Sequence, residues 1–250
     1  MIYLTPIQIF HHIQMATPEA IAKRLVDAHS VGYKFEPWRE RMKFDSLSIL
    51  KFFKQVMEQH SIPYFIVNGT LLGALKYTGQ IAHDDDIDIG CFIEDMPRIT
   101  LAIQQALSGT PYRMIDSFYG KIIYGSDRGM LDILVFTQHV DGRYKMAYPL
   151  ANGVPSFWMS KLRKYDFSYE ELLPLRKYNF EDFDVWGPAS GTEVCLRVYG
   201  KDVFEVCRRP DGGMGVHIFW PQVTKAINPL TQGIADMVGK HFPGMLNKKG

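Results

Sequence analysis

Apolar positions at regular spacing predict a helix and then a strand in the first third of the chain. In residues 45–60 they recur at helical spacing, and either Asp45 or Ser46 can act as the N-cap. Pro63 stops this helix, and the apolar run 64–67 is typical of a short buried strand. We therefore expect a helix that leads directly into a buried strand.

Four further segments follow the same logic. Residues 86–93 alternate acidic and apolar side chains, which indicates a strand with one buried face. Residues 97–107 have helical periodicity and precede Gly109, a typical helix end. The segments 118–125 and 130–137 flank the turn sequence SDRG and predict an antiparallel hairpin.

The pattern divides the chain into three parts. We expect an N-terminal arm at 1–44, a compact core at 45–137 and a C-terminal half at 138–250. The signals in the last part are weaker, although GTEVCLRVYG at 191–200 predicts a helix. Helices and strands in both halves indicate an α+β fold.

Composition places the chain among folded intracellular proteins. Its 250 residues are 46% hydrophobic and 22% charged, ordinary values for a globular protein. The three cysteines form no C-x-x-C pair, which fits a reducing compartment. The net charge of +1 provides no field to attract nucleic acid, and no apolar run is long enough to span a membrane. We therefore expect a soluble, cytoplasmic protein that does not bind nucleic acid.

Aspartates crowd into residues 84–88, within the string DDDIDIG. Carboxylates this close repel one another, so their concentration needs a reason. On a strand, Asp86 and Asp88 point to the same face, about 6.6 Å apart at Cα, while Ile87 and Ile89 point to the core. Aligned carboxylates suit a hard divalent cation such as Mg²⁺ or Mn²⁺, so we predict a metal site at this pair.

Two other motifs are excluded at these positions. An EF-hand loop that begins at Asp84 would need glycine where Ile89 stands. A P-loop that begins at Gly69 would need a second glycine where Ala74 stands. A solvated acidic turn explains Asp84 and its neighbour, but it does not explain acids that alternate with isoleucine. The metal site is therefore the better interpretation.

The string NGTLLGA at 68–74 links the first predicted strand to a helix. Gly69 allows a close approach of the backbone, Thr70 offers a hydroxyl, and the N–H groups of the first helical turn attract anions. These features predict a phosphate site. The glycines could also serve a tight strand-to-helix turn, and for this string alone the turn is the better interpretation.

Taken together, the two strings resemble a known family. Residues 68–92 are similar to the G-T-L-L-G-A…D-D-D-I-D-I-G pattern of the LicD/fukutin phosphotransferases, in the nucleotidyltransferase-fold superfamily. MLDILVF at 130–136 and the segment 172–202 continue the similarity, which covers about residues 45–205. Ala82-His83 departs from the family's Pro-Trp. The resemblance implies a nucleotidyltransferase-like mixed sheet flanked by helices, with an α+β C-terminal half.

The resemblance also implies a reaction. It is the Mg²⁺-dependent (or Mn²⁺-dependent) transfer of a phospho-alcohol, such as phosphocholine or an alditol phosphate, from a CDP conjugate to a hydroxyl, with release of CMP. The acceptor would be a glycan, and residues 138–250 would shape its site. Asp132 would complete the carboxylate cluster as ligand or base, and Asp84 would be a weak or water-mediated ligand. Lys76, where the family has arginine, and Lys121 are candidates to contact substrate phosphate.

Two other functions would use the same residues. A nucleotidyltransferase acting on a protein, an RNA or a small molecule would attack the α-phosphorus of a nucleotide and release pyrophosphate. A non-catalytic relative would only bind nucleotide or glycan, and the complete set of Asp86, Asp88 and Asp132 argues against that possibility.

Overall fold

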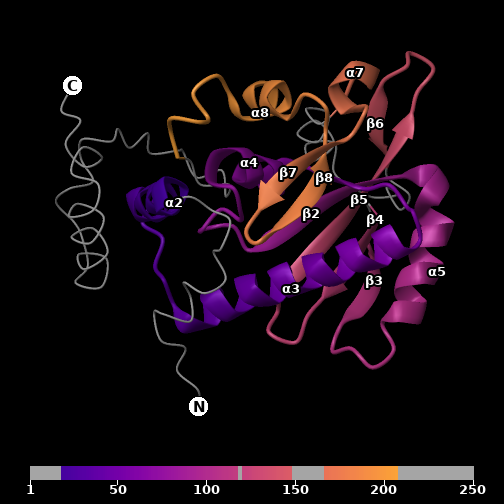
Figure 1. Ribbon diagram of the computed structural model, residues 1–250, viewed down its shortest axis with the longest axis horizontal. Helices are drawn as coiled ribbons and strands as arrows, with labels where there is room; N and C mark the ends of the chain where they lie inside the picture. Colours follow the sequence, from indigo (N-terminus) through magenta and orange to yellow (C-terminus); the bar gives the residue numbers. More distant parts are fainter. Residues whose placement is uncertain (1–17, 118–119, 148–165, 208–250) are drawn as a thin grey trace.

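A computed structural model describes residues 18–117, 120–147 and 166–207 (Figure 1). The helices are α2 (Pro18–Ser30), α3 (Pro37–Gln59), α4 (Asn68–Tyr77), the short 3₁₀ helix η1 (Ile93–Asp95), α5 (Met96–Ala106), α7 (Tyr169–Leu172) and α8 (Gly191–Tyr199). The strands are β1 (Phe65–Ile66), β2 (Asp86–Phe92), β3 (Arg113–Ser117), β4 (Gly120–Tyr124), β5 (Met130–Gln138), β6 (Tyr144–Ala147), β7 (Arg176–Phe180) and β8 (Phe183–Gly187).

The main sheet is mixed. Its strand order is β1-β2-β5-β4-β3, and β6 pairs with the far end of β5. The strands β2 and β5 are parallel, whereas the other pairs are antiparallel, including the predicted β4–β5 hairpin. The hairpin β7–β8 is a separate two-stranded sheet whose strand β8 contacts β1. Helices flank the main sheet, which confirms the expected fold class (Figure 1).

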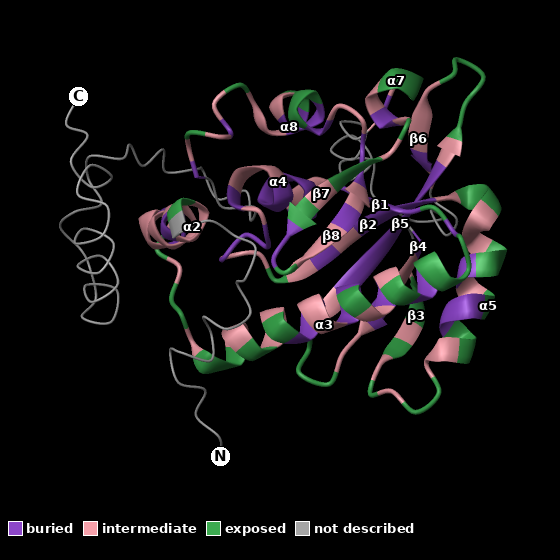
Figure 2. Cartoon of the chain, viewed as in Figure 1, coloured by how far each residue is buried: buried purple, intermediate pink, exposed green. Residues whose placement is uncertain are grey.

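The core lies around the central strands. Most of β5 is buried, as Figure 2 shows, and α3 contacts β2, β4 and β5. Phe53 of α3 and the isoleucines of β2, Ile87 and Ile89, are fully buried in the same hydrophobic cluster. The predicted helical stripe and the predicted buried face of β2 therefore both point to the core.

The helix α3 begins earlier than the sequence predicts. Asp45 and Ser46 therefore do not cap it, because both lie inside the helix and are buried. Their side chains hold the β4–β5 turn instead. A carboxylate oxygen of Asp45 accepts hydrogen bonds from the N–H groups of Asp127 (2.8 Å) and Gly129 (2.9 Å). The prediction was wrong because these polar groups serve a distant turn, which local pattern cannot reveal.

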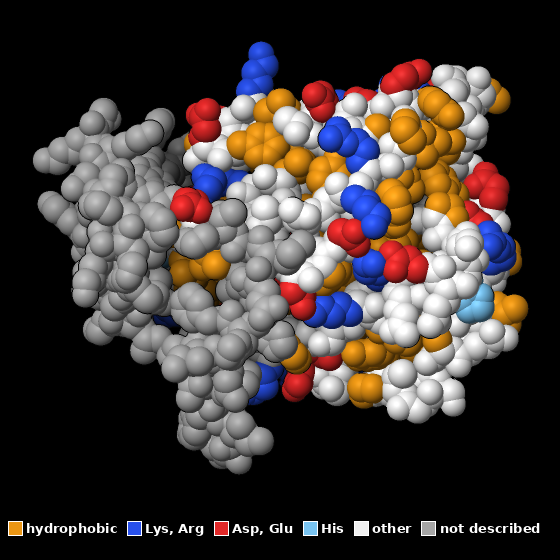
Figure 3. All heavy atoms as spheres, in the orientation of Figure 1, with side chains coloured by type: hydrophobic (Ala, Val, Ile, Leu, Met, Phe, Trp, Pro, Cys, Tyr) orange, Lys and Arg blue, Asp and Glu red, His pale blue; other side chains and the backbone are white. Residues whose placement is uncertain are grey.

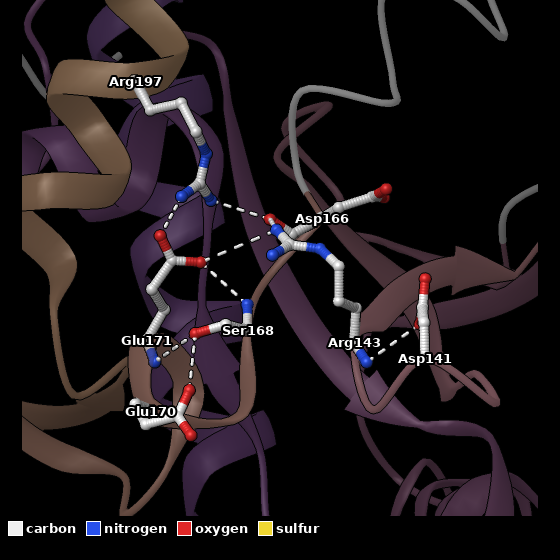
Figure 4. Close-up of polar contacts among 7 residues, drawn as sticks. All are labelled: Asp141, Arg143, Asp166, Ser168, Glu170, Glu171 and Arg197. Atoms are coloured by element: carbon white, nitrogen blue, oxygen red, sulfur yellow. Dashed lines mark hydrogen bonds and ion pairs between the residues drawn. The ribbon is translucent and has the colours of Figure 1, made fainter.

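Polar contacts attach the last described segment, residues 166–207, to the sheet, as Figure 4 shows. Arg143 and Arg197 both donate to the main-chain carbonyl of Asp166, over 3.1 and 2.7 Å. The carboxylate of Glu171 pairs with Arg197 and also accepts from the N–H of Ser168 (2.7 Å), in a capping box at the start of α7. Two arginines and one glutamate thus connect the β5–β6 region with α7 and α8.

Parts of the expected three-part division lie outside the described residues. These are 1–17 of the arm and 148–165 and 208–250 of the C-terminal half, so the division stays a prediction. In the described part of the chain, no helix has the length and apolar character needed to cross a membrane. On the face shown in Figure 3, acidic and basic side chains are interspersed.

Candidate active site

Three aspartates from two parallel strands meet on one face of the main sheet. Asp88 of β2 lies directly opposite Asp132 of β5 in the strand register, and Asp86 is two residues before Asp88. One carboxylate oxygen from each of the three lies within 4.8 Å of the others. Because side chains alternate along a strand, Ile87 and Ile89 occupy the opposite face, where they are fully buried. The structure thus brings together the three carboxylates that the sequence singled out.

A second acidic group adjoins the first and shares Asp86. One oxygen each from Asp84, Asp85 and Asp86 also lies within 4.8 Å of the others. A side-chain hydrogen bond links Asp84 and Asp86, whereas Asp85 is exposed. Either group offers only hard oxygen donors, the ligand type that Mg²⁺ and Mn²⁺ prefer.

Burial and mutual repulsion raise the pKa values of these acids. Burial, followed by the charge of Asp132, raises the pKa of Asp86 to about 7. Burial, followed by the charge of Asp86, raises the pKa of both Asp84 and Asp88 well above the ordinary range. A hydrogen bond from Asn68 opposes the shift at Asp88. The cluster therefore retains protons near neutral pH, and a divalent cation would compete with them.

On the edge of β2 opposite β5, contacts from beyond the end of β1 fix the main chain where the acids lie. Just beyond the end of β1, Val67 N–H still donates to the carbonyl of Asp88, over 3.2 Å. The hydroxyl oxygen of Thr70 accepts from Asp88 N–H (2.8 Å), and the amide of Gln80 donates to the carbonyl of Asp86 (3.3 Å). The acids thus project from a main chain held by the first turn of α4 and by the loop after it.

Gly69 and Thr70 contact the acids in the structure. Thr70 is only 2% exposed, and its hydroxyl oxygen supports the main chain of β2. A side chain at Gly69 would meet the carboxylate of Asp84 where it now lies, so glycine permits the close approach of that acid. In the structure it is Asp84 that lies close to Gly69, and the approach of a phosphate there stays a prediction.

Replacing Thr70 with valine should lower the free energy of unfolding by about 1–3 kcal/mol, because Asp88 N–H would lose its acceptor. Denaturant unfolding measures this change. Thr70→Ser keeps the hydroxyl and is the matched control, with a smaller loss expected. Equal losses in both variants would mean that packing of the methyl group, rather than the hydrogen bond, stabilises the turn.

Lys76 is not brought to the acidic cluster. Its side chain is 3% exposed, and its ammonium group pairs with Asp27 of α2 (3.0 Å) and donates to the carbonyl of Val206 (3.0 Å). Tyr77 donates to the same carboxylate over 2.6 Å. Lys76 therefore holds α2 and the main chain at Val206 against α4, and its contact with a substrate phosphate stays a prediction.

Lys121 lies on the strand predicted for it, but on the wrong face. It is opposite Ile133 in the β4–β5 register, whereas Ile122 is opposite Asp132. Directly paired residues point to the same face, so the side chain of Lys121 points away from the acidic cluster. It pairs with Asp116 of β3 over 2.6 Å.

Sequence reasoning missed two residues at this site. Asn68 has a left-handed backbone conformation (φ 48°), and its side chain donates to Asp88. An asparagine directly before glycine at a strand end was a usable signal, because asparagine tolerates this conformation. Gln80 lies outside the two acidic groups in the sequence, and only the fold brings its amide to Asp86.

Comparison with known proteins identifies the family. The sequence model for the LicD/FKTN/FKRP nucleotidyltransferase domain matches residues 61–190, about half of the chain. An uncharacterised protein of Rickettsia typhi is 32% identical over 165 residues, which cover 66% of this chain and 47% of that protein. The ribitol-5-phosphate transferase FKTN of Mus musculus is 30% identical over 172 residues, covering 66% of this chain and 33% of that protein.

A shorter match is to the LicD protein, after which the family is named. The lipopolysaccharide cholinephosphotransferase LicD of Haemophilus influenzae is 44% identical over 43 residues, which cover 17% of this chain and 16% of that protein. The chain spans less than half the length of each of these three relatives. On the strength of the domain match, the chain belongs to the LicD/FKTN/FKRP family.

Proposed function

We propose that this chain catalyses metal-dependent transfer of a phospho-alcohol group from a CDP conjugate to a hydroxyl, with release of CMP. The observation that carries the proposal is the meeting of Asp86, Asp88 and Asp132 within 4.8 Å of one another. Two relatives support the group transferred, since one is named as a ribitol-phosphate transferase and another as a cholinephosphotransferase. Both of those groups are phospho-alcohols, and a glycan is the acceptor class that we propose.

The three carboxylates fit a Mg²⁺ or Mn²⁺ ion. They offer oxygen ligands only, and their pKa values are raised by burial and then by the charges of the neighbouring aspartates, a repulsion that a cation would relieve. Asp84, hydrogen-bonded to Asp86, would support the ligand set as a weak or water-mediated ligand. When bound, the ion would supply positive charge to the diphosphate oxygens of the donor.

The chain's own residues would align the reactants and manage one proton. Gln80 and Thr70 fix the main chain at Asp86 and Asp88, so both carboxylates are positioned before the substrate binds. Asp132 is 8% exposed and either completes the ligand set or accepts the proton of the acceptor hydroxyl. A bond forms between the acceptor oxygen and phosphorus, the bond from phosphorus to the CMP oxygen breaks, and CMP leaves with the electron pair.

Product analysis tests the proposal. The protein is incubated with Mg²⁺ and either a CDP-alcohol (CDP-choline, CDP-ribitol) or CTP, with glycan acceptors, after a thermal-shift panel has selected the donor that stabilises it. We expect CMP from a CDP-alcohol. Pyrophosphate from CTP, without CMP from any CDP-alcohol, would instead identify a nucleotidyltransferase. Stabilisation by donor without turnover would indicate a binding protein.

A further inference from the structure

The carbonyl of Asp86 lies at an edge of β2 that no strand of the described residues covers. Along a strand, alternate residues present their N–H and C=O groups to the same edge. Asp88 therefore shares its edge with Asp86, and Val67 at the end of β1 accounts for the carbonyl of Asp88. At Asp86 the place of a neighbouring strand is taken by the side-chain amide of Gln80, which donates over 3.3 Å.

Gln80 is itself fixed by a residue about one hundred positions later in the sequence, Glu181. The residue is only 4% exposed, and its main-chain N–H donates to a carboxylate oxygen of Glu181 in the β7–β8 turn, over 2.8 Å. Arg24 of α2 donates to that same oxygen, also over 2.8 Å. Glu181 is buried, and its own N–H donates to the carbonyl of Thr78 over 2.8 Å.

The packing around this group leaves little freedom. A side chain at Gly79 would clash with both Arg24 and Glu181, so the loop before Gln80 lies directly against the ion pair. Glu181 is in the tight β7–β8 turn and adopts a left-handed backbone conformation (φ 55°), which is uncommon for a non-glycine residue. A buried ion pair with this geometry specifies one arrangement of the loop, because separating either partner would leave a buried charge.

We propose that Gln80 is a positioning residue for the metal site, and that Glu181 and Arg24 act through it. The amide of Gln80 sets the main chain of Asp86, so the N-terminal helix α2 and the C-terminal hairpin β7–β8 jointly determine where that carboxylate lies. The inference rests on the proposed function, since it takes Asp86 as a metal ligand. Groups that orient metal ligands from outside typically change metal affinity by about 10–100-fold when they are removed.

The test is Mn²⁺ affinity, measured from the free-ion EPR signal of the purified full chain. Gln80→Met keeps the length of the side chain and removes its donor, so we expect Mn²⁺ to bind about 10-fold more weakly. Tyr178→Phe is the matched control, because it also removes one partly buried hydrogen bond to a carbonyl, that of Pro188, away from β2. Both variants lose some thermal stability, but only Gln80→Met should change the affinity.

Variants of Glu181 test whether it acts on Asp86 through Gln80, while Gln80 itself is unchanged. Glu181→Gln keeps an oxygen toward Gln80 N–H and should bind Mn²⁺ nearly as the wild type does, whereas Glu181→Leu should reproduce the loss. Combined with Gln80→Met, Glu181→Leu should add little further loss, because both act on one contact. If Gln80→Met fails to fold, the comparison of the two Glu181 variants decides.

The outcomes separate this inference from the proposed function. Wild-type protein that does not bind Mn²⁺, or binds it equally well as Asp88→Asn, would overturn the metal site itself. Wild-type binding that is lost in Asp88→Asn but unchanged in folded Gln80→Met and Glu181→Leu would leave the site intact and overturn the positioning role of Gln80.

Discussion

Asp88→Asn should lower metal-dependent turnover by more than about 100-fold and, in the metal-free protein, raise Tm. Asp88 lies opposite Asp132 in the strand register, and its carboxylate is grouped with those of Asp86 and Asp132. Loss of a ligand should exceed the about 10–100-fold effect of groups that only orient ligands. The amide also removes one of the crowded charges that raise the pKa values of the cluster, and this relieves repulsion in the folded state.

Opposite changes in turnover and stability separate a metal ligand from a structural residue. CMP release measures the first, and thermal unfolding in EDTA measures the second. Asp127→Asn is the matched control, because Asp127 is exposed in the β4–β5 turn and is not part of either acidic group. A fall of only a few-fold in Asp88→Asn, or a loss of turnover together with a loss of stability, would contradict a ligand role.

The acidic cluster could be predicted because each half of it follows from a local pattern. Alternation along β2 places Asp86 and Asp88 on the face opposite Ile87, and the structure has this arrangement. The turn sequence SDRG predicts the β4–β5 hairpin, which is present and carries Asp132. The local patterns left open the parallel pairing of β2 with β5, and the family resemblance implied only that Asp132 completes the cluster.

Lys76 and Lys121 do not lie where the sequence reasoning placed them, and the reason is physical. A strand assignment does not say which face a side chain occupies, because a shift of one residue in register exchanges the faces. Lys121 was assigned to the correct strand, yet the register with β5 places it opposite Ile133 and away from Asp132. Lys76 pairs with Asp27, a contact between segments far apart in sequence that no local pattern encodes. The same applies to the long-range contacts of Asp45.

The affinity for Mn²⁺ should rise with pH up to about pH 7 and then level off. If binding of the ion releases one proton, the rise is about tenfold for each pH unit. The cation must displace protons that burial and the charge of Asp132 hold on Asp86. Interacting carboxyls titrate as a group, so the midpoint belongs to the cluster. Titration of Mn²⁺ binding at a series of pH values measures the slope and the midpoint.

The stability of the metal-free protein should change in the opposite direction. The pKa of Asp86 is higher in the folded chain than in the unfolded chain, where it is about 4. The stabilisation from its proton is therefore complete below about pH 4 and is lost as pH rises through about 7. We expect Tm in EDTA to fall over this window in the wild type and to fall less in Asp86→Asn, which carries no titrating group there. Equal pH profiles of Tm for the two proteins, or a midpoint of Mn²⁺ binding near pH 4, would mean that the carboxyls are not crowded enough to hold protons.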